Sequence, residues 1–147
     1  MYKIHLQTQI NTSLKNLFTL WKKPNLLLKH ASSLNDLKVI KRKGDIIDTR
    51  WDLDIKGLNL VWYQQDILNK DKGRIDFAVT KGDFVDYRGF WLVTPLENNR
   101  VKLELDASFD WKIPVLEPYV KESLQRKTKT IFKSFFSSIK KTLKNNE

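Results

Sequence analysis

The sequence contains no cysteine, which excludes disulfide bonds and thiolate metal sites and leaves the redox compartment open. Histidine is nearly as scarce, with His5 and His30 as the two examples and no His-x-x-x-His spacing. His5 falls on the polar face of an expected strand and His30 at the end of an expected helix. A Ser–His–Asp arrangement has no sequence support. We therefore assign no catalytic residue and expect neither a metal site nor a cofactor.

Long apolar runs are also missing. No stretch of about 18 apolar residues could span a membrane. The start of the chain, MYKIHLQTQI, lacks the apolar block of a signal peptide, so a soluble, cytoplasmic protein is expected. A chain of 147 residues predicts a single domain over 1–147. An apolar content of 41% is typical of a globular protein with a core.

The excess of basic residues gives a net charge of +10, which suggests an acidic partner or reflects a general lysine bias. Nucleic acid is an unlikely partner, because basic residues alternate with acids on the expected strands and form no aromatic-rich platform. The C-terminal stretch RKTKTIFKSFFSSIKKTLK combines an apolar stripe with lysines. Such a helix could make transient contact with an anionic membrane.

Glycine is rare, and two of the five glycines lie in nearly identical phrases, KGDIIDTR at 43–50 and KGDFVDYR at 81–88. We interpret the repeat as a structural device used twice, in which Gly44 and Gly82 make hairpin turns. A single glycine is fewer than a phosphate-binding loop needs. The pairs expected to meet as exposed charges on the polar face are Asp48 with Arg50 and Asp86 with Arg88.

Alternation of apolar and polar residues predicts seven strands: one at 2–10 and six between residues 36 and 111. Helical spacing predicts a short helix after the N-cap candidates at 11–13 and a second one from Pro24. A third helix of about 28 residues should run from about 115 to 144. The short turns between strands imply an antiparallel sheet, whose apolar face the long C-terminal helix must cover.

The inward faces of these strands are rich in aromatic residues, which could pack as core or together line an apolar pocket of roughly 300–1,000 Å³. Gln64 is a weaker candidate, because the face of Trp62 is ambiguous. Lys127 or Thr128 interrupts the helix stripe where a large apolar residue is expected, which suggests a gap. The predicted lining residues are Thr49, Trp51, Trp62, Phe77, Tyr87, Trp91, Leu105, Phe109, Val120, Leu124, Ile131 and Phe135.

This order of elements resembles the START-like or helix-grip superfamily, specifically its polyketide cyclase/dehydrase and coenzyme Q-binding branch. The likeness covers essentially the whole chain. Its most recognisable stretch is YRGFWLVTPLENNRVKLELDASFDWKIP at 87–114, with Gly89, Trp91, Leu92 and Pro95 before a turn and an alternating strand. The resemblance implies an α+β fold in which a curved antiparallel sheet of about seven strands wraps around the C-terminal helix. It also implies an internal cavity for lipids, polyketides, quinones or hormones.

Three functions remain open at this level. The first is a non-catalytic carrier of a hydrophobic small molecule, such as a lipid, quinone or polyketide-like compound. The second is a cyclase or dehydratase in the same pocket, with Tyr87 or an inward carboxylate as the acid/base. The third is an interaction protein with a collapsed core. The identity of the ligand and the oligomeric state are not predicted.

Overall fold

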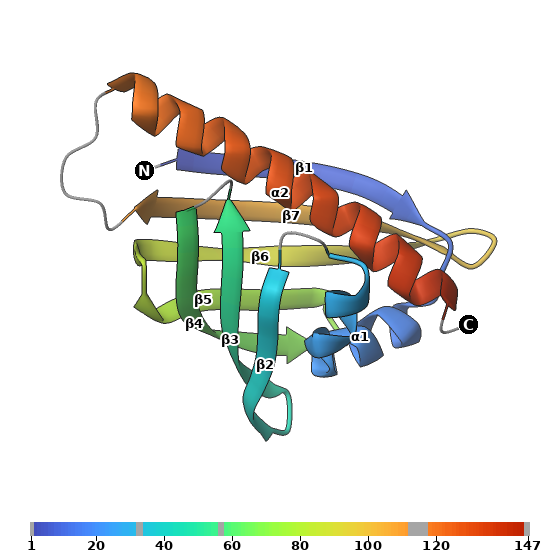
Figure 1. Cartoon of the computed structure of the whole chain (residues 1–147). Helices are drawn as coiled ribbons and strands as arrows, with labels where there is room; N and C mark the ends of the chain where they lie inside the picture. Colours follow the sequence, from blue (N-terminus) through green and yellow to red (C-terminus); the bar gives the residue numbers. More distant parts are fainter. Residues whose placement is uncertain (1, 32–33, 56–57, 112–117, 146–147) are drawn as a thin grey trace.

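The computed structural model describes residues 2–31, 34–55, 58–111 and 118–145 (Figure 1). It contains the expected strand, two short helices, six further strands and one long helix. The bounds are β1 Tyr2–Ile10, α1 Leu14–Lys22, η1 Pro24–Lys29, β2 Leu34–Lys43, β3 Ile46–Ile55, β4 Leu58–Asn69, β5 Arg74–Gly82, β6 Phe84–Leu96, β7 Arg100–Trp111 and α2 Pro118–Asn145.

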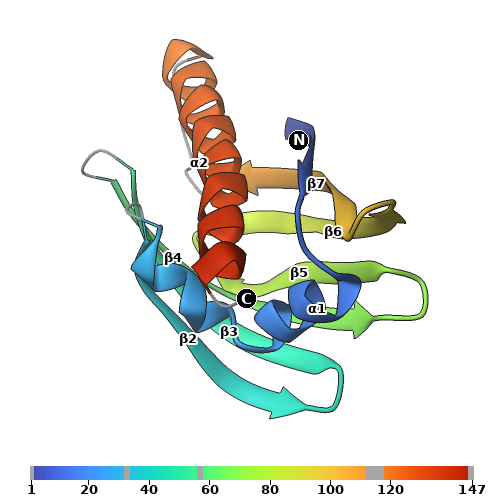
Figure 2. The same ribbon diagram turned by 90° about the vertical axis from the view of Figure 1, so that its right-hand side faces the viewer.

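The seven strands form one antiparallel sheet in the order β1-β7-β6-β5-β4-β3-β2. Strands β2 to β7 follow one another as a meander, and β1 joins the sheet by pairing with β7. Figure 2 shows that the sheet curves around α2, which lies along the concave face. The α+β helix-grip architecture expected from the sequence is therefore confirmed.

The two short helical segments begin where the sequence places a cap and a proline. The Ser13 hydroxyl accepts a hydrogen bond from the Asn16 backbone N–H at 3.1 Å, which satisfies a free donor at the start of α1. Pro24 begins η1, a 3₁₀ helix, where its missing N–H costs nothing. Together α1 and η1 cover one end of the concave face, beside the C-terminal end of α2 (Figure 1).

Helix α2 turns its apolar face to the sheet. Ile131, Phe132, Phe135, Phe136 and Ile139 are buried. The Ser138 hydroxyl on the same face donates to the backbone carbonyl of His30 at 2.9 Å, which ties α2 to the end of η1. Among the described residues, no helix is both long and apolar enough to cross a membrane.

The inward faces predicted for the strands are largely confirmed by burial, although Trp51 and Val79 are only half-buried. Strand β7 shows this most clearly, because every second residue from Val101 to Phe109 is buried. Trp111, the last residue of that series, lies outside the residues whose side chains are described. Ile47, Thr49 and Leu53 are buried on β3 as expected.

The two KGD phrases do not form the same structure, so the prediction of one device used twice is only partly right. Gly44 occupies a tight turn between the paired residues Lys43 and Ile46, with φ +60°. Gly82 also has positive φ, +127°, but it stays paired with Trp62 of β4. A Cβ at Gly82 would lie 2.5 Å from the Trp62 Cα, whereas one at Gly44 would meet nothing within 4 Å. Gly82 is needed for close backbone approach as well as for the turn.

The predicted ion pairs are half right. Arg88 lies 3.5 Å from Asp86, as expected. Arg50 instead approaches Asp52, at 3.9 Å, while the Asp48 carboxylate accepts a hydrogen bond from Gln65 at 3.2 Å. The reason is geometric, because Asp48 and Gln65 are directly opposite each other in the β3–β4 ladder. The pairing of Asp48 with Arg50 was therefore wrong.

Candidate functional site

The concave face of the sheet and the helices enclose a cavity of about 40 Å³. Strands β3 to β6 supply one wall, α1 and η1 a second, and α2 a third. The lining is mainly apolar and aromatic. It consists of Leu20, Trp21, Pro24, Leu27, Trp51, Gln64, Asp66, Phe77, Tyr87, Trp91, Phe132, Phe135 and Ile139.

Ring contacts join the aromatic side chains around this cavity. Trp51 and Trp62, opposite each other on β3 and β4, stack with centroids 5.6 Å apart and planes 7° from parallel. Tyr87 meets Trp62 edge-on at 5.9 Å and Phe77 at 5.1 Å. Trp21 of α1 meets Trp91 edge-on at 5.1 Å. These contacts connect the wall made by α1 to the sheet.

A row of buried polar side chains crosses this aromatic surface along β4. The Trp62 indole N–H donates to Gln64 Oε1 at 2.8 Å, and Gln64 Nε2 donates to Asp66 Oδ1 at 2.8 Å. A second indole, that of Trp51, donates to the hydroxyl of Thr49 at 2.8 Å. The hydrogen bonds offset part of the cost of burying these groups.

Asp66 is the carboxylic acid of the site, and its surroundings shift its pKa. Burial raises its pKa from 3.8 to about 7, while the hydrogen bond from Gln64 opposes the rise and the charge of Asp48 adds to it. The pKa of Tyr87 is also raised, first by burial and then by the negative charge of Asp66. Both shifts come from removing a charge from water in an apolar interior.

The structure places the predicted lining residues in three groups. Trp51, Phe77, Tyr87, Trp91 and Phe135 line the cavity. Thr49 and Trp62 are buried beside it and hydrogen-bond to residues that line it. Leu105, Phe109 and Ile131 are buried in the core without lining the cavity, and Val120 and Leu124 lie outside the residues whose side chains are described.

Sequence reasoning missed Asp66 and the whole wall made by α1 and η1. Asp66 was not predicted because the stretch LNLVWYQQDIL does not alternate cleanly between apolar and polar residues. Its inner face carries the polar residues Gln64 and Asp66, and its outer face carries Ile67. The register of the β3–β4 hairpin could have identified the inward residues of β4. It places Trp62, Gln64 and Asp66 opposite the inward residues Trp51, Thr49 and Ile47, respectively.

The cavity is much smaller than the pocket expected from the sequence. About 40 Å³ holds only a few water molecules, because one water needs roughly 10–15 Å³ on this measure. Large aromatic side chains from three walls fill the space that the curved sheet leaves. Thr128, at the expected gap in α2, is buried but does not line the cavity.

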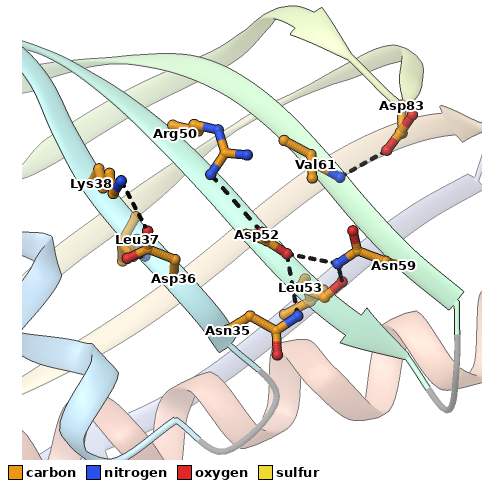
Figure 3. A network of polar contacts seen from close by, with 10 residues as sticks. All are labelled: Asn35, Asp36, Leu37, Lys38, Arg50, Asp52, Leu53, Asn59, Val61 and Asp83. Carbon is orange, nitrogen blue, oxygen red and sulfur yellow. Dashed lines mark hydrogen bonds and ion pairs between the residues drawn. The ribbon is translucent and has the colours of Figure 1, made fainter.

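The outer face of the sheet carries a separate polar network, shown in Figure 3. At its centre, the Asp52 carboxylate accepts hydrogen bonds from Asn59 at 2.6 Å and Asn35 at 3.2 Å. These two hydrogen bonds lower the pKa of Asp52, and the bond from Asn59 has the larger effect. Asp83 likewise accepts from the Val61 backbone N–H at 2.7 Å. The network connects β2, β3 and β4 on the side away from the cavity, so we assign it a structural role.

The comparisons with known proteins agree on one family of folds. A family model described as "Polyketide cyclase / dehydrase and lipid transport" matches residues 10–136. The structure is similar to that of TTHA0849 from Thermus thermophilus, with TM-score 0.92, 18% identity and 99% of each chain covered.

Two further solved structures are similar. The Zhui aromatase/cyclase from Streptomyces sp. R1128 gives a TM-score of 0.86 at 11% identity, covering 97% of this chain and 93% of its own. A START superfamily protein from Mycobacterium smegmatis gives 0.80 at 12% identity, covering 100% of both chains. No curated protein matches the sequence. At these identities the structural likeness concerns the fold.

Proposed function

This chain belongs to the polyketide cyclase/dehydrase and lipid transport family of the START-like superfamily, and from that premise we propose that it binds a hydrophobic small molecule between the sheet and α2. The ligand class is a lipid, a quinone or a polyketide-like compound. The observation that carries the proposal is the aromatic cavity with a short polar row. Apolar walls with a few convergent polar groups are the usual form of a small-molecule site.

A lipid, quinone or polyketide-like ligand is larger than the cavity, whose volume is about 40 Å³, so one wall of the cavity must move when such a ligand binds. The strands are held by ladder hydrogen bonds, so separating them would break several bonds at once. The wall made by α1 and η1 is held mainly by side-chain contacts, including Trp21 on Trp91. We therefore expect α1 and η1 to move outward when a ligand enters.

Native mass spectrometry of the protein purified from its own host tests the proposal, because a retained lipid or quinone adds a defined mass. The neutral dye prodan provides a second test, by its fluorescence in apolar surroundings. Leu27→Trp should fill the cavity from η1 and weaken prodan binding. Leu26→Trp, the same change at the exposed neighbour, should leave binding unchanged. If the folded protein carries no bound mass and does not bind prodan, the proposal is wrong and the interior is only a packed core.

A second function, that of a cyclase or dehydratase, is favoured by the raised pKa of Asp66, about 7. A carboxyl group with a pKa near neutral pH can both accept and donate a proton. Such reactions on polyketide-like substrates include removal of a proton beside a carbonyl. The test is hydrogen–deuterium exchange at C2 of 1-tetralone in D₂O, followed by mass spectrometry. Wild-type protein should accelerate the exchange and Asp66→Asn should not; equal rates would count against an enzyme.

We also propose that α2 allows transient contact with an anionic membrane. At 3.6 residues per turn, five of the exposed basic residues described on α2 fall within an arc of about 60°, and Lys141, also exposed, lies about 60° outside that arc. Each basic residue near an anionic surface contributes roughly 1 kcal/mol. The residues of this stripe are Arg126, Lys129, Lys133, Lys140 and Lys144.

Co-sedimentation with vesicles tests the membrane contact. Binding should require phosphatidylserine, weaken with added salt and fall in a Lys133→Glu/Lys140→Glu variant. The matched control reverses Lys70 and Lys72, exposed lysines in the turn after β4. An equal loss in both variants would indicate a response to net charge and not to the stripe on α2.

A further inference from the structure

The polar row on β4 has a defined direction. The indole N–H of Trp62 can only donate, so the amide of Gln64 must turn its oxygen toward Trp62. The Gln64 amide nitrogen then faces Asp66 and donates to Oδ1. This leaves Oδ1 as an acceptor, whichever charge the carboxyl group carries. When Asp66 is neutral, its proton therefore belongs on Oδ2.

The surroundings of Asp66 favour this neutral form. Among the described residues that line the cavity there is no lysine, arginine or histidine, so none of these side chains stabilises a carboxylate there. Tyr87 of β6 is the other titratable lining residue, and Asp48 of β3 adds a negative charge from the strand alongside. The described lining side chains from β5, α1, η1 and α2 are uncharged. Each of these features opposes ionisation.

We infer that Asp66 acts as a neutral hydrogen-bond donor, through Oδ2, to a carbonyl oxygen of an uncharged hydrophobic ligand. The inference rests on the proposed ligand-binding function and names the chemical group that the pocket selects. The aromatic walls hold the apolar body of the ligand, and the row Trp62–Gln64–Asp66 presents one oriented donor to its oxygen. A ligand without such an oxygen leaves that donor unpaired, which costs affinity.

A protonated amine is the alternative partner for a buried carboxyl group among aromatic faces. It requires Asp66 in its charged form, which the uncharged lining and the charge of Asp48 both disfavour. The net charge of +10 also works against attraction of a cation. The two ligand types respond to pH in opposite directions, so one experiment separates them.

The experiment compares three ligands with one carbon skeleton: tetralin, 1-tetralone and 1-aminotetralin. Binding is followed by the quenching of tryptophan fluorescence, to which Trp21, Trp51 and Trp91 of the cavity lining contribute, at pH 5.5 and pH 8.5. We expect 1-tetralone to bind about tenfold more tightly than tetralin at pH 5.5, the worth of one buried hydrogen bond. The preference should vanish at pH 8.5, because an ionised Asp66 no longer offers a donor.

Three variants isolate the role of Asp66. Asp66→Asn keeps an acceptor for Gln64 and places an N–H donor where Oδ2 lies, so its preference for 1-tetralone should persist at both pH values. Asp66→Leu should show no preference at either pH. Asp54→Asn, an exposed acid of β3, should behave as the wild type does.

The outcomes separate this inference from the proposed function. Equal binding of tetralin and 1-tetralone at both pH values would overturn the inference and leave a hydrophobic pocket in place. A preference for 1-aminotetralin that grows with pH would overturn it in favour of a charged Asp66. Failure of all three ligands to bind would also overturn it, and the native mass spectrum would then decide whether any ligand is held.

Discussion

At the scale of single residues, Asp66 changes what the interior can do. Its neighbours on β4 and across the ladder are tryptophan, glutamine and isoleucine, so the carboxyl group has little to stabilise a charge. An ionised group in such surroundings costs native stability, while the same group in the unfolded chain ionises freely. Between pH 4 and pH 8 the ionisation of Asp66 should therefore make the stability of the protein depend on pH.

The first prediction concerns that dependence. Between the unfolded pKa of 3.8 and the native pKa of about 7, the native state holds a proton that the unfolded state has released. The free energy of unfolding should thus fall as pH rises through this range, by about 4 kcal/mol at most. Asp66→Asn should remove this fall and make the protein more stable than wild type at pH 8. Urea denaturation of the wild type and of Asp66→Asn at pH 4 and pH 8 measures the change in the free energy of unfolding.

Asp54→Asn is the control for this experiment, because it removes an exposed acid from a neighbouring strand. It should keep the wild-type dependence on pH. Parallel pH profiles for wild type and Asp66→Asn would show that Asp66 is not the source of the dependence.

The second prediction contrasts the two glycines of the repeated phrase. Gly44→Ala should cost about 1–2 kcal/mol, because positive φ is unfavourable for alanine but the space is open. Gly82→Ala should cost roughly 3 kcal/mol or more, since its Cβ would also meet the backbone of β4. Thermal unfolding of the two variants checks the order. Similar losses would mean that β4 and β5 can separate locally at no cost.

At the scale of elements, the sequence predicted those features that leave a periodic pattern of apolar and polar residues. The burial of β7 and the length of α2 followed from alternation and helical spacing, because each pattern reflects one face turned to the core. Asp66 and the α1–η1 wall could not be predicted in this way. A polar residue on an inner face breaks the pattern, and contacts such as Trp21 with Trp91 depend on how elements far apart in sequence meet.

The third prediction concerns the packing of β1, β7 and α2. Phe109 of β7 meets Tyr2 of β1 at 5.2 Å and Phe132 of α2 at 6.4 Å, and it does not line the cavity. Phe109→Ala should therefore cost about 3–5 kcal/mol, the full loss for a packed aromatic residue. Ser108→Ala, on the opposite face of the strand, should change stability little. Denaturant titrations measure the free energy of unfolding of the two variants. A small loss of stability in Phe109→Ala would indicate loose packing around Phe109.

At the scale of the whole molecule, the sheet and the α1–η1 wall differ in how they are held. The strands share ladder hydrogen bonds along their length, whereas α1 and η1 rest on the sheet and α2 through side chains and the hydrogen bond from Ser138 to His30. Regions held in this way open at lower free energy. Of the three walls of the cavity, the one made by α1 and η1 should therefore yield more easily than the one made by the strands.

The fourth prediction follows from this difference. Amide hydrogens of α1 and η1 should exchange with solvent faster than those of β4 to β6, and prodan should slow the exchange in α1 and η1 selectively. Hydrogen–deuterium exchange with mass spectrometry measures both effects. Leu27→Trp, which fills the cavity, should abolish the effect of prodan. Protection confined to the strands would place the moving wall elsewhere.

The pairing of β1 with β7 has a consequence for the order of folding. The paired residues, from Tyr2 with Phe109 to Ile10 with Val101, are about 100 residues apart along the chain, whereas each of the other pairings in the described sheet joins two strands that are consecutive in sequence. Closing so long a loop costs more entropy than forming a hairpin, and contacts of this kind slow folding. During synthesis, β1 leaves the ribosome before β7 and can pair with it only after β7 has emerged. Until then its apolar face is open, and the meander is the template on which it finally docks.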